Sequence, residues 1–370
     1  MQKMLQNPLT EVIKLGQSIW YDGLISRNEF DRMIREDGLR GATTNPVIFE
    51  KALASGKVDG KVCELGKSLN DEQIYQTLAI EAVQEVADVF LPVYRRTLGY
   101  DGYVSIEVSP LLAYDTEHTL NEARELFQKV NRPNVMIKIP ATAAGIPAIE
   151  TAISEGINVN ITLIFSVARY REVMEAYLSG LEKRHMSGKS IQEVASVASF
   201  FVSRVDTAVD KIIEEKIASA KDSVQKAFFG QLLGKTAVAN SKVAYAEFEE
   251  LFSGERFRAL KSEGAQMQRP LWASTGTKNL SYRDVLYVES LIGPNTVDTI
   301  PPATLDAFRD HGKVSETLTE GLGEAKKILE DLAFVGIALS VVTEELEKAG
   351  VELFNEAYLK IIKRIKEKRT

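Results

Sequence analysis

Short runs of β-type residues recur along the chain, and each is followed by apolar residues at helical spacing. We predict eight strands from these runs, at Ser18–Asp22, Gly41–Thr44, Tyr103–Val108, Val135–Ile139, Ile157–Phe165, Ser196–Phe201, Leu271–Ser274 and Thr296–Ile300. Strands that alternate with helices are typical of βαβ units in a parallel sheet. Eight such units predict an α/β fold in which a single (β/α)8 TIM barrel closes on itself.

The alternation of apolar and polar residues is clearest in the fifth predicted strand. The two sets are Ile157, Val159, Ile161 and Leu163 against Asn158, Asn160 and Thr162. Because successive side chains of a strand point to opposite faces, we expect the apolar set to face the outer helices and the polar set to point into the barrel. The same parity places Glu107 and Lys138 inside. Inward polar residues at the carboxyl ends of barrel strands indicate an active site.

The helical stretches are also readable. Ile146, Ile149 and Ile153 follow a spacing of three and four residues, and Gly156 stands where a helix C-cap glycine belongs. Two longer helical stretches, at 205–252 and 315–369, exceed what a minimal barrel needs. No repeat of fixed period, low-complexity segment or Pro/Gly-rich linker divides the chain. We therefore expect one barrel domain over 1–370 with additional helices, including a C-terminal helical extension at about 315–370.

The composition is that of an ordinary globular protein, with 45% hydrophobic and 26% charged residues in a chain of 370. The 45 Lys and Arg against 52 Asp and Glu leave a net charge of −7, whereas a nucleic-acid-binding protein usually has a basic excess. The basic run KIIKRIKEKR at 360–369 is typical of a solvated helix end. The longest uncharged stretch, Gly156–Ala168, is shorter than the ~20 residues of a membrane span. The N-terminal MQKMLQNPLTEVIK lacks the apolar core of a secretion signal. We expect a cytoplasmic protein with neither a nucleic-acid nor a membrane partner.

Metal and disulfide chemistry have little support in the sequence. Cys63 is the only cysteine, and the three histidines, His118, His185 and His311, lie far apart. One cysteine excludes an internal disulfide and a Cys-based zinc site. The histidines form no metal-ligand spacing. We therefore expect no metal site.

Lys138 is the first candidate catalytic residue, because it lies in the apolar run VMIKIP. Burial of an ammonium is costly and lowers the pKa of the amine, as a nucleophile that attacks a carbonyl requires. The alternative is a lysine that snorkels from an edge strand. Glu107 shares its parity on the neighbouring strand and could be a structural ion-pair partner or a general acid/base. Asp22, at the end of the first strand, adds a second inward carboxylate.

Other polar residues at strand ends could bind a substrate. Asn45 and Asn160 offer donors and acceptors to hydroxyl groups, although such residues are more often turn or cap residues. Arg204 and the run Ser274–Lys278 follow the sixth and seventh strands, where hydroxyls, a glycine and cations suit a phosphate. Barrel enzymes often bind phosphate on their late loops. The alternative for Arg204 is a surface ion pair with an aspartate of the next helix, Asp206 or Asp210.

Taken together, the motifs around these candidate residues resemble those of the transaldolase family. The motifs that carry the resemblance are ATTNP (42–46), VSIEVSPLLAYD (104–115), MIKIPAT (136–142), NVNITLIFS (158–166), SFFVSR (199–204) and IPPATL (300–305). They match the family in order and spacing from about Asp22 to Leu305. The length and the long C-terminal helical segment are similar to those of the larger bacterial branch.

The resemblance implies a role for each candidate residue. Lys138 would form the Schiff base, Glu107 would be the acid/base through a water that Thr162 also holds, and Asp22 would relay protons. Asn45, Asn160 and Ser199 would bind the dihydroxyacetone portion, and Phe201 would keep the cavity dry. Arg204, Ser274 and Lys278 would bind the sugar phosphate, although the family commonly has Ser-Phe-Arg-Asn where this chain has the longer run Ser274–Asn279. A lysine in place of arginine exchanges a bidentate fork for a point charge.

The implied activity is that of a transferase of the pentose phosphate pathway. It would move a dihydroxyacetone unit from sedoheptulose 7-phosphate to glyceraldehyde 3-phosphate, giving erythrose 4-phosphate and fructose 6-phosphate. The iminium on Lys138 would be the electron sink, so no cofactor is expected. The partners would be sugar phosphates, and the protein would be a monomer or homodimer.

Two alternatives stand beside this activity. A related Schiff-base aldolase releases free dihydroxyacetone, but that branch typically has glutamine at the position of Glu107 and tyrosine at that of Phe201. A non-catalytic barrel that binds sugar phosphates would be expected to lack the lysine or the carboxylates, and Lys138, Glu107 and Asp22 are all present. Fold alone does not separate these functions.

Overall fold

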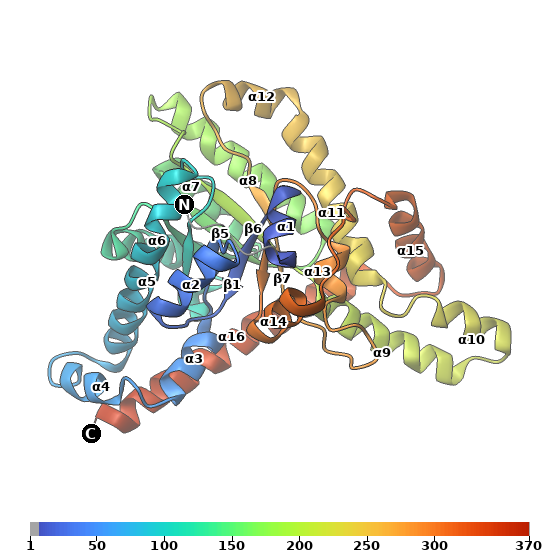
Figure 1. Cartoon of the computed structure of the whole chain (residues 1–370), viewed down its shortest axis with the longest axis horizontal. Coiled ribbons are helices and arrows are strands. Elements are labelled where there is room, and N and C mark those ends of the chain that lie inside the picture. Colours follow the sequence, from blue (N-terminus) through green and yellow to red (C-terminus); the bar gives the residue numbers. More distant parts are fainter. Residues whose placement is uncertain (1–6, 370) are drawn as a thin grey trace.

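Eight parallel strands close into a barrel in chain order, β1 to β8, in the computed structural model, which describes residues 7–369 (Figure 1). The strands are β1 (Gln17–Asp22), β2 (Gly41–Thr43), β3 (Val104–Glu107), β4 (Val135–Pro140), β5 (Val159–Ile164), β6 (Ser196–Phe201), β7 (Arg269–Ala273) and β8 (Thr296–Ile300). Their ends differ from the predicted ends by no more than two residues. The predicted (β/α)8 barrel with additional helices is confirmed. Residues 1–6 of the N-terminal run considered above, and Thr370, lie outside the described residues.

Helices surround the barrel and extend beyond it. The first half of the chain contains α1 (Pro8–Lys14), α2 (Arg27–Glu36), α3 (Pro46–Ala54), α4 (Asp59–Leu65), α5 (Asp71–Arg96), the 3-10 turn η1 (Pro110–Leu112), α6 (Thr116–Val130), α7 (Gly145–Glu155) and α8 (Val167–Met186). The second half contains α9 (Ser203–Ser219), α10 (Ser223–Gly230), α11 (Thr236–Ser253), α12 (Glu255–Ser262), α13 (Leu286–Ser290), α14 (Pro302–His311), α15 (Leu322–Phe334) and α16 (Leu339–Arg369). The two long helical stretches predicted at 205–252 and 315–369 are thus α9 to α11 and α15 to α16. No helix between residues 7 and 369 is long and apolar enough to cross a membrane.

Local sequence signals explain several helix ends. The Asn45 side chain accepts a hydrogen bond from the backbone N–H of Ile48 (3.0 Å), which caps the start of α3 directly after β2. α7 ends at Gly156 as predicted, because this residue has a φ of +93°, which glycine adopts without strain. The Asn45 cap thus fixes the loop after β2 at the carboxyl end of the barrel, and Gly156 fixes the turn into β5 at the amino end.

β5 departs from the strict alternation predicted for it. Its register with β6 shifts between Ile161 and Ile164, and Leu163 has a φ of +59°. An extra residue of this kind bends a strand and re-aims its side chains. The Leu163 side chain packs on Gly350 of α16, where a Cβ would lie only 2.8 Å from it. The bulge therefore brings the end of β5 into packing contact with the C-terminal helix.

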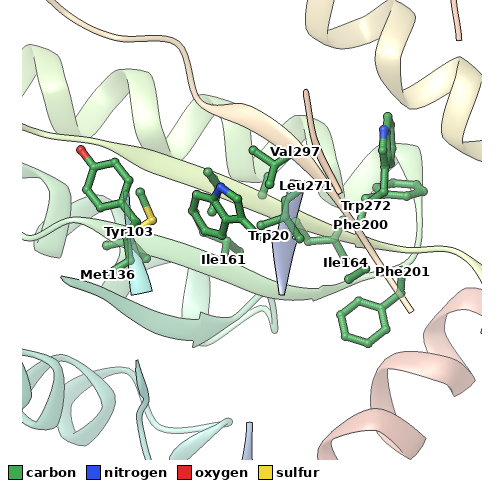
Figure 2. Close-up of a cluster of buried hydrophobic side chains, with 14 of the residues drawn as sticks. Trp20, Tyr103, Met136, Ile161, Ile164, Phe200, Phe201, Leu271, Trp272 and Val297 are labelled. Atoms are coloured by element: carbon green, nitrogen blue, oxygen red, sulfur yellow. The ribbon is translucent and has the colours of Figure 1, made fainter. Parts of the chain in front are cut away.

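The apolar core extends along the barrel from Tyr103 and Met136 at one end to Ile164 and Phe201 at the other (Figure 2). Trp20 of β1 is fully buried within it. Its neighbour in register is Gly41 of β2, and a Cβ there would lie 2.7 Å from the indole ring. The glycine thus makes room for a tryptophan that fills the barrel below the strand ends.

A charged network closes the amino end of the barrel. Arg269 of β7 forms a buried ion pair with Asp101 (2.9 Å) and lies 4.0 Å from the centre of the Tyr100 ring. The Ser18 hydroxyl of β1 donates to Asp101 (2.8 Å) and accepts from Arg269 (2.9 Å). Every bond links segments far apart in the chain, so the network ties β1, β7 and the start of β3 together.

Removal of the buried charge partner should destabilise the protein strongly. Asp101→Asn leaves the Arg269 guanidinium buried without its anion, and we expect a loss of about 3–5 kcal/mol in the free energy of unfolding. The matched control is Glu36→Gln, which breaks the exposed Arg32–Glu36 pair of α2 and should cost about 0–1 kcal/mol. Urea denaturation followed by circular dichroism measures both. Equal losses in the two variants would contradict a structural role for the network.

Candidate active site

A cavity of about 280 Å³ lies at the carboxyl end of the barrel. The sequence-predicted residues that line it are Asp22, Asn45, Lys138, Ser199, Phe201, Arg204, Ser274 and Lys278. Glu107, Asn160 and Thr162 are not in its lining, and the contacts described below place Glu107 and Asn160 directly behind it. A larger cavity of about 430 Å³ lies between α5 and α6 and includes only Glu107 from the predicted set. The predicted residues therefore converge on the first cavity.

Lys138 is buried inside the barrel, with 4% of its surface exposed. It stands beside Glu107 in the register of β3 and β4, and its Nζ lies 3.6 Å from a Glu107 carboxylate oxygen. The Nζ also donates to the backbone carbonyl of Thr44 (3.2 Å) and lies 5.8 Å from the centre of the Phe354 ring. The lysine is therefore held in the cavity wall and does not snorkel to solvent.

Glu107 is a carboxylic acid poised between its two charge states. Burial raises its pKa to about 7, although the Lys138 ammonium acts in the opposite direction. Within residues 7–369, its Oε2 has no hydrogen-bond partner, and neither has Oγ1 of the buried Thr162 on β5. Buried polar atoms normally have a partner, so both are available to a water molecule or a substrate hydroxyl.

Asp22 is held at the end of β1 by two threonines that sequence reasoning missed. The Thr43 hydroxyl donates to Asp22 (2.9 Å) and shares a 2.6 Å hydrogen bond with the Thr299 hydroxyl. Burial raises the pKa of Asp22, while Lys138 lowers it. Thr43 is the last residue of β2, and Thr299 is the last but one of β8. Their parity at the strand ends was therefore the signal that could have identified them.

The polar residues of β5 and β6 form a chain behind the cavity. The Ser199 hydroxyl donates to Asn160 Oδ1 (2.7 Å), and Asn160 Nδ2 donates to the Ser105 hydroxyl (2.9 Å). Asn160 is thus fixed on both sides, which leaves Ser199 as the member that lines the cavity. Asn45 is both the cap of α3 and part of the lining, so the cap interpretation and the site interpretation both hold for it.

Arg204 lies in the cavity wall without a carboxylate partner among the described residues. No carboxylate among residues 7–369 forms an ion pair with it, and its guanidinium lies 5.6 Å from the centre of the Phe201 ring. Burial lowers its pKa. The alternative of a surface pair with Asp206 or Asp210 is wrong, because these carboxylates accept hydrogen bonds from Tyr287 and Tyr282 instead.

Three cations besides Lys138 share the cavity wall. Arg204 and Lys278 were predicted, whereas Lys51 of α3 was missed because nothing in its surroundings in the sequence marks it. The Ser274 hydroxyl lies in the same wall. Cations with a hydroxyl and no internal anion are suited to bind a phosphate group.

The C-terminal helix covers the mouth of the barrel, a point that the sequence left open. Leu353 and Phe354 of α16 line the cavity. α16 runs along α3 and ends beside α4, and it also contacts α9 (Figure 1). These helices follow β2 and β6 or lie near them, so α16 crosses the carboxyl ends of the strands and not the flank of the barrel.

Comparison with known proteins points to one family. The family model "Transaldolase/Fructose-6-phosphate aldolase" matches residues 19–365. A transaldolase of Trichodesmium erythraeum is 43% identical, covering 99% of this chain and 98% of its own length. A transaldolase of Thermobifida fusca is 44% identical, with 97% of each chain covered. A transaldolase of Mycobacterium tuberculosis is 43% identical, with 96% of each covered.

The titration of Glu107 tests the electrostatics of this cavity. We expect its carboxyl to titrate near pH 7, and Lys138→Met to raise the pKa further because the ammonium that favours the carboxylate is gone. Lys51→Met, which removes a rim lysine, should leave the pKa unchanged. Infrared difference spectra recorded across the pH range measure the carboxyl band, and Glu107→Gln assigns it. A band that titrates near pH 4.5, or one that ignores Lys138→Met, would contradict the described coupling.

Proposed function

Because the chain belongs to the transaldolase/fructose-6-phosphate aldolase family, we propose that it transfers a dihydroxyacetone unit from sedoheptulose 7-phosphate to glyceraldehyde 3-phosphate. The products are erythrose 4-phosphate and fructose 6-phosphate, as in the pentose phosphate pathway. The observation that carries the proposal is Lys138, buried 3.6 Å from Glu107 in a cavity whose wall also holds cations that form no ion pair within residues 7–369. The carbonyl carbon of a sugar phosphate can contact the Lys138 amine while its phosphate group contacts the cations.

The first half of the reaction forms the covalent intermediate. Lys138 Nζ, after giving a proton to Glu107, attacks the C2 carbonyl of the ketose phosphate. Glu107, whose pKa lies near 7, returns this proton to the C2 oxygen and then carries a second proton from the nitrogen to the same oxygen, which leaves as water and yields an iminium. A water molecule between Glu107 and Thr162 would carry these protons, because each group has an oxygen without a hydrogen-bond partner in the part of the chain that the structure describes.

The second half breaks and remakes a carbon–carbon bond. Asp22 accepts the proton of the C4 hydroxyl, the C3–C4 bond breaks, and its electron pair moves into the iminium to give an enamine. The shortened aldose phosphate leaves. The enamine carbon then attacks the carbonyl carbon of the acceptor aldehyde and restores the iminium, Asp22 gives its proton to the aldehyde oxygen to form the new hydroxyl, and hydrolysis of the iminium releases the longer ketose from Lys138. The raised pKa of Asp22 suits a group that takes and returns a proton.

The remaining cavity residues would bind the substrate. Asn45, Ser199 and, through Ser199, Asn160 would hold the hydroxyls of the three-carbon unit. Phe201, which packs on Phe165 with ring centres 5.1 Å apart, would keep water from the enamine. Arg204, Ser274 and Lys278 would bind the phosphate. Glu107 and Phe201 favour transfer over simple release of dihydroxyacetone, the reaction of the aldolase branch.

We also propose the setting in which the enzyme works. The exposed, unpaired Cys63 suits a reducing compartment, which supports a cytoplasmic location. Because α16 completes the cavity, we propose that the barrel and the extension at about 315–370 act as one domain over 1–370. A monomer or a homodimer would suffice.

The covalent intermediate gives the most direct test. Borohydride reduction in the presence of fructose 6-phosphate should attach a three-carbon adduct to Lys138, which peptide mapping by mass spectrometry locates. Lys51→Met should still form the adduct, whereas Lys138→Met should not. Without an acceptor aldehyde, consumption of fructose 6-phosphate should stop near one equivalent. An adduct on another lysine would overturn the mechanism, and continued release of dihydroxyacetone would assign the chain to the aldolase reaction.

Arg204 gives an independent test of phosphate recognition. A charge-assisted contact with phosphate contributes roughly 2–4 kcal/mol, so Arg204→Ala should lower kcat/KM for fructose 6-phosphate by about 30- to 1,000-fold. Unphosphorylated fructose does not make this contact, so its kcat/KM should change little. The control is Arg171→Ala, since Arg171 is an exposed arginine that pairs with Glu247. An unchanged ratio of the two donors would show that Arg204 does not bind the phosphate.

A further inference from the structure

The segment 274–285 connects β7 to α13 and carries Lys278 into the cavity. Lys278 itself is exposed, and a lysine side chain has many rotamers. A flexible loop that carried this flexible side chain would lose much of the benefit of a phosphate contact, because both would have to be ordered on binding. The position of Lys278 therefore depends on what holds the loop.

The start of the loop is fixed by its own backbone and by two hydroxyls. The Ser203 backbone N–H donates to the Ser274 carbonyl (3.1 Å), and the two serine hydroxyls lie 3.0 Å apart. The Thr275 hydroxyl donates to the buried Asp298 of β8 (3.0 Å). Ser274 has a φ of +57°, a strained conformation for a residue with a side chain. These hydrogen bonds stabilise the strained backbone at Ser274 and set the direction in which the loop leaves β7.

The far end of the loop is fixed by two tyrosines that donate to carboxylates of α9. The Tyr282 hydroxyl donates to Asp210 (2.8 Å), and the Tyr287 hydroxyl donates to Asp206 (2.9 Å). The Tyr282 ring also packs on Gly234, where a Cβ would lie 2.7 Å from it. Lys278 thus lies between a fixed start and a fixed end.

Both carboxylates are buried and neither forms an ion pair within residues 7–369. Their second oxygens accept from the backbone, Asp210 from Gly234 (2.9 Å) and Asp206 from Ala237 (2.6 Å). Burial raises the pKa of both groups, to about 7 for Asp206. Burial of two carboxylates costs solvation free energy. We therefore do not expect them to serve only as attachment points for the loop.

The same two carboxylates stand one helical turn apart on the helix that carries Arg204. At offsets of two and six residues from Arg204 they do not share its face of α9, because neighbours on a helix face stand three or four residues apart. They accept hydrogen bonds from the two tyrosines, and Arg204 forms no ion pair among residues 7–369. The helix that carries Arg204 therefore also holds the loop that carries Lys278, so one element places both cations.

We propose that Asp206 and Asp210 are positioning residues for phosphate recognition, which act by holding Tyr287 and Tyr282 so that Lys278 and Arg204 face the same phosphate. This inference rests on the proposed function, since it requires that the two cations bind the substrate phosphate. The inference bears on the difference from the shorter Ser-Phe-Arg-Asn loop named in the sequence analysis. A rigid loop that fixes Lys278 would supply the geometric precision that the planar guanidinium of an arginine supplies there.

The test is Tyr282→Phe, which removes one hydroxyl and keeps the ring. We expect the KM for fructose 6-phosphate to rise about 3- to 10-fold with kcat unchanged, and kcat/KM for fructose to stay constant. The matched control is Tyr245→Phe, which removes a hydroxyl bond to the Pro294 carbonyl outside the cavity lining and should change neither constant. A general loss of stability would affect both donors alike.

A double-mutant cycle with Lys278→Ala decides whether Tyr282 acts through Lys278. In the Lys278→Ala background, Tyr282→Phe should have no further effect on KM, whereas independent effects would multiply and overturn the inference. Arg204→Ala serves as the reference for the proposed function. If Arg204→Ala raises KM and Tyr282→Phe does not, the positioning role fails alone. If Arg204→Ala also leaves the donor ratio unchanged, the phosphate site and this inference fail together.

Discussion

The buried contact between Lys138 and Glu107 is the interaction on which the rest of the site depends. An ammonium and a carboxyl 3.6 Å apart in the barrel interior stabilise each other's charge, while burial works against both. The pKa of Glu107 near 7 is the balance of these effects, and it allows this carboxyl to take up or release a proton at neutral pH. The register of β3 and β4 sets this distance, because it places the two residues side by side. Closure of the barrel then brings Asp22 from β1 to the same cavity.

Strand parity was sufficient to predict this part of the site, whereas contacts made by distant segments were not. Period-two alternation and barrel closure together force Lys138, Glu107 and Asp22 inward, so the sequence pattern alone located them. The bulge at Leu163 escaped prediction because an inserted residue changes parity without changing composition. The position of α16 over the mouth of the barrel was also not predicted, because the apolar face of a helix does not specify which surface it packs against. The Tyr282–Asp210 bond joins residues that no local pattern relates.

The arginines at the two ends of the barrel have opposite electrostatic surroundings, with Arg269 buried and Arg204 partly buried. At the amino end, burial alone lowers the pKa of Arg269, but Asp101 and Tyr100 outweigh that effect and the pKa is raised. At the carboxyl end, burial lowers the pKa of Arg204 and no anion opposes it. A charge that is satisfied within the chain holds the fold together, whereas a charge left unsatisfied creates affinity for something outside it. Asp206 and Asp210, the aspartates nearest to Arg204 in the sequence, accept hydrogen bonds from Tyr287 and Tyr282 instead.

The depth of the charged groups orients the proposed substrate. Lys138 is buried beneath Phe354 of α16, whereas Lys278 and Lys51 are exposed at the rim of the same cavity. A sugar phosphate that entered with its phosphate first would bury a dianion beside Glu107 and Asp22, which is unfavourable in a region of low dielectric constant. Entry with the carbonyl end first leaves the phosphate among the rim cations and brings the carbonyl carbon to the amine. The same arrangement serves every phosphorylated donor and acceptor of the proposed reaction, because they share the phosphate and differ in the length of chain between it and Lys138.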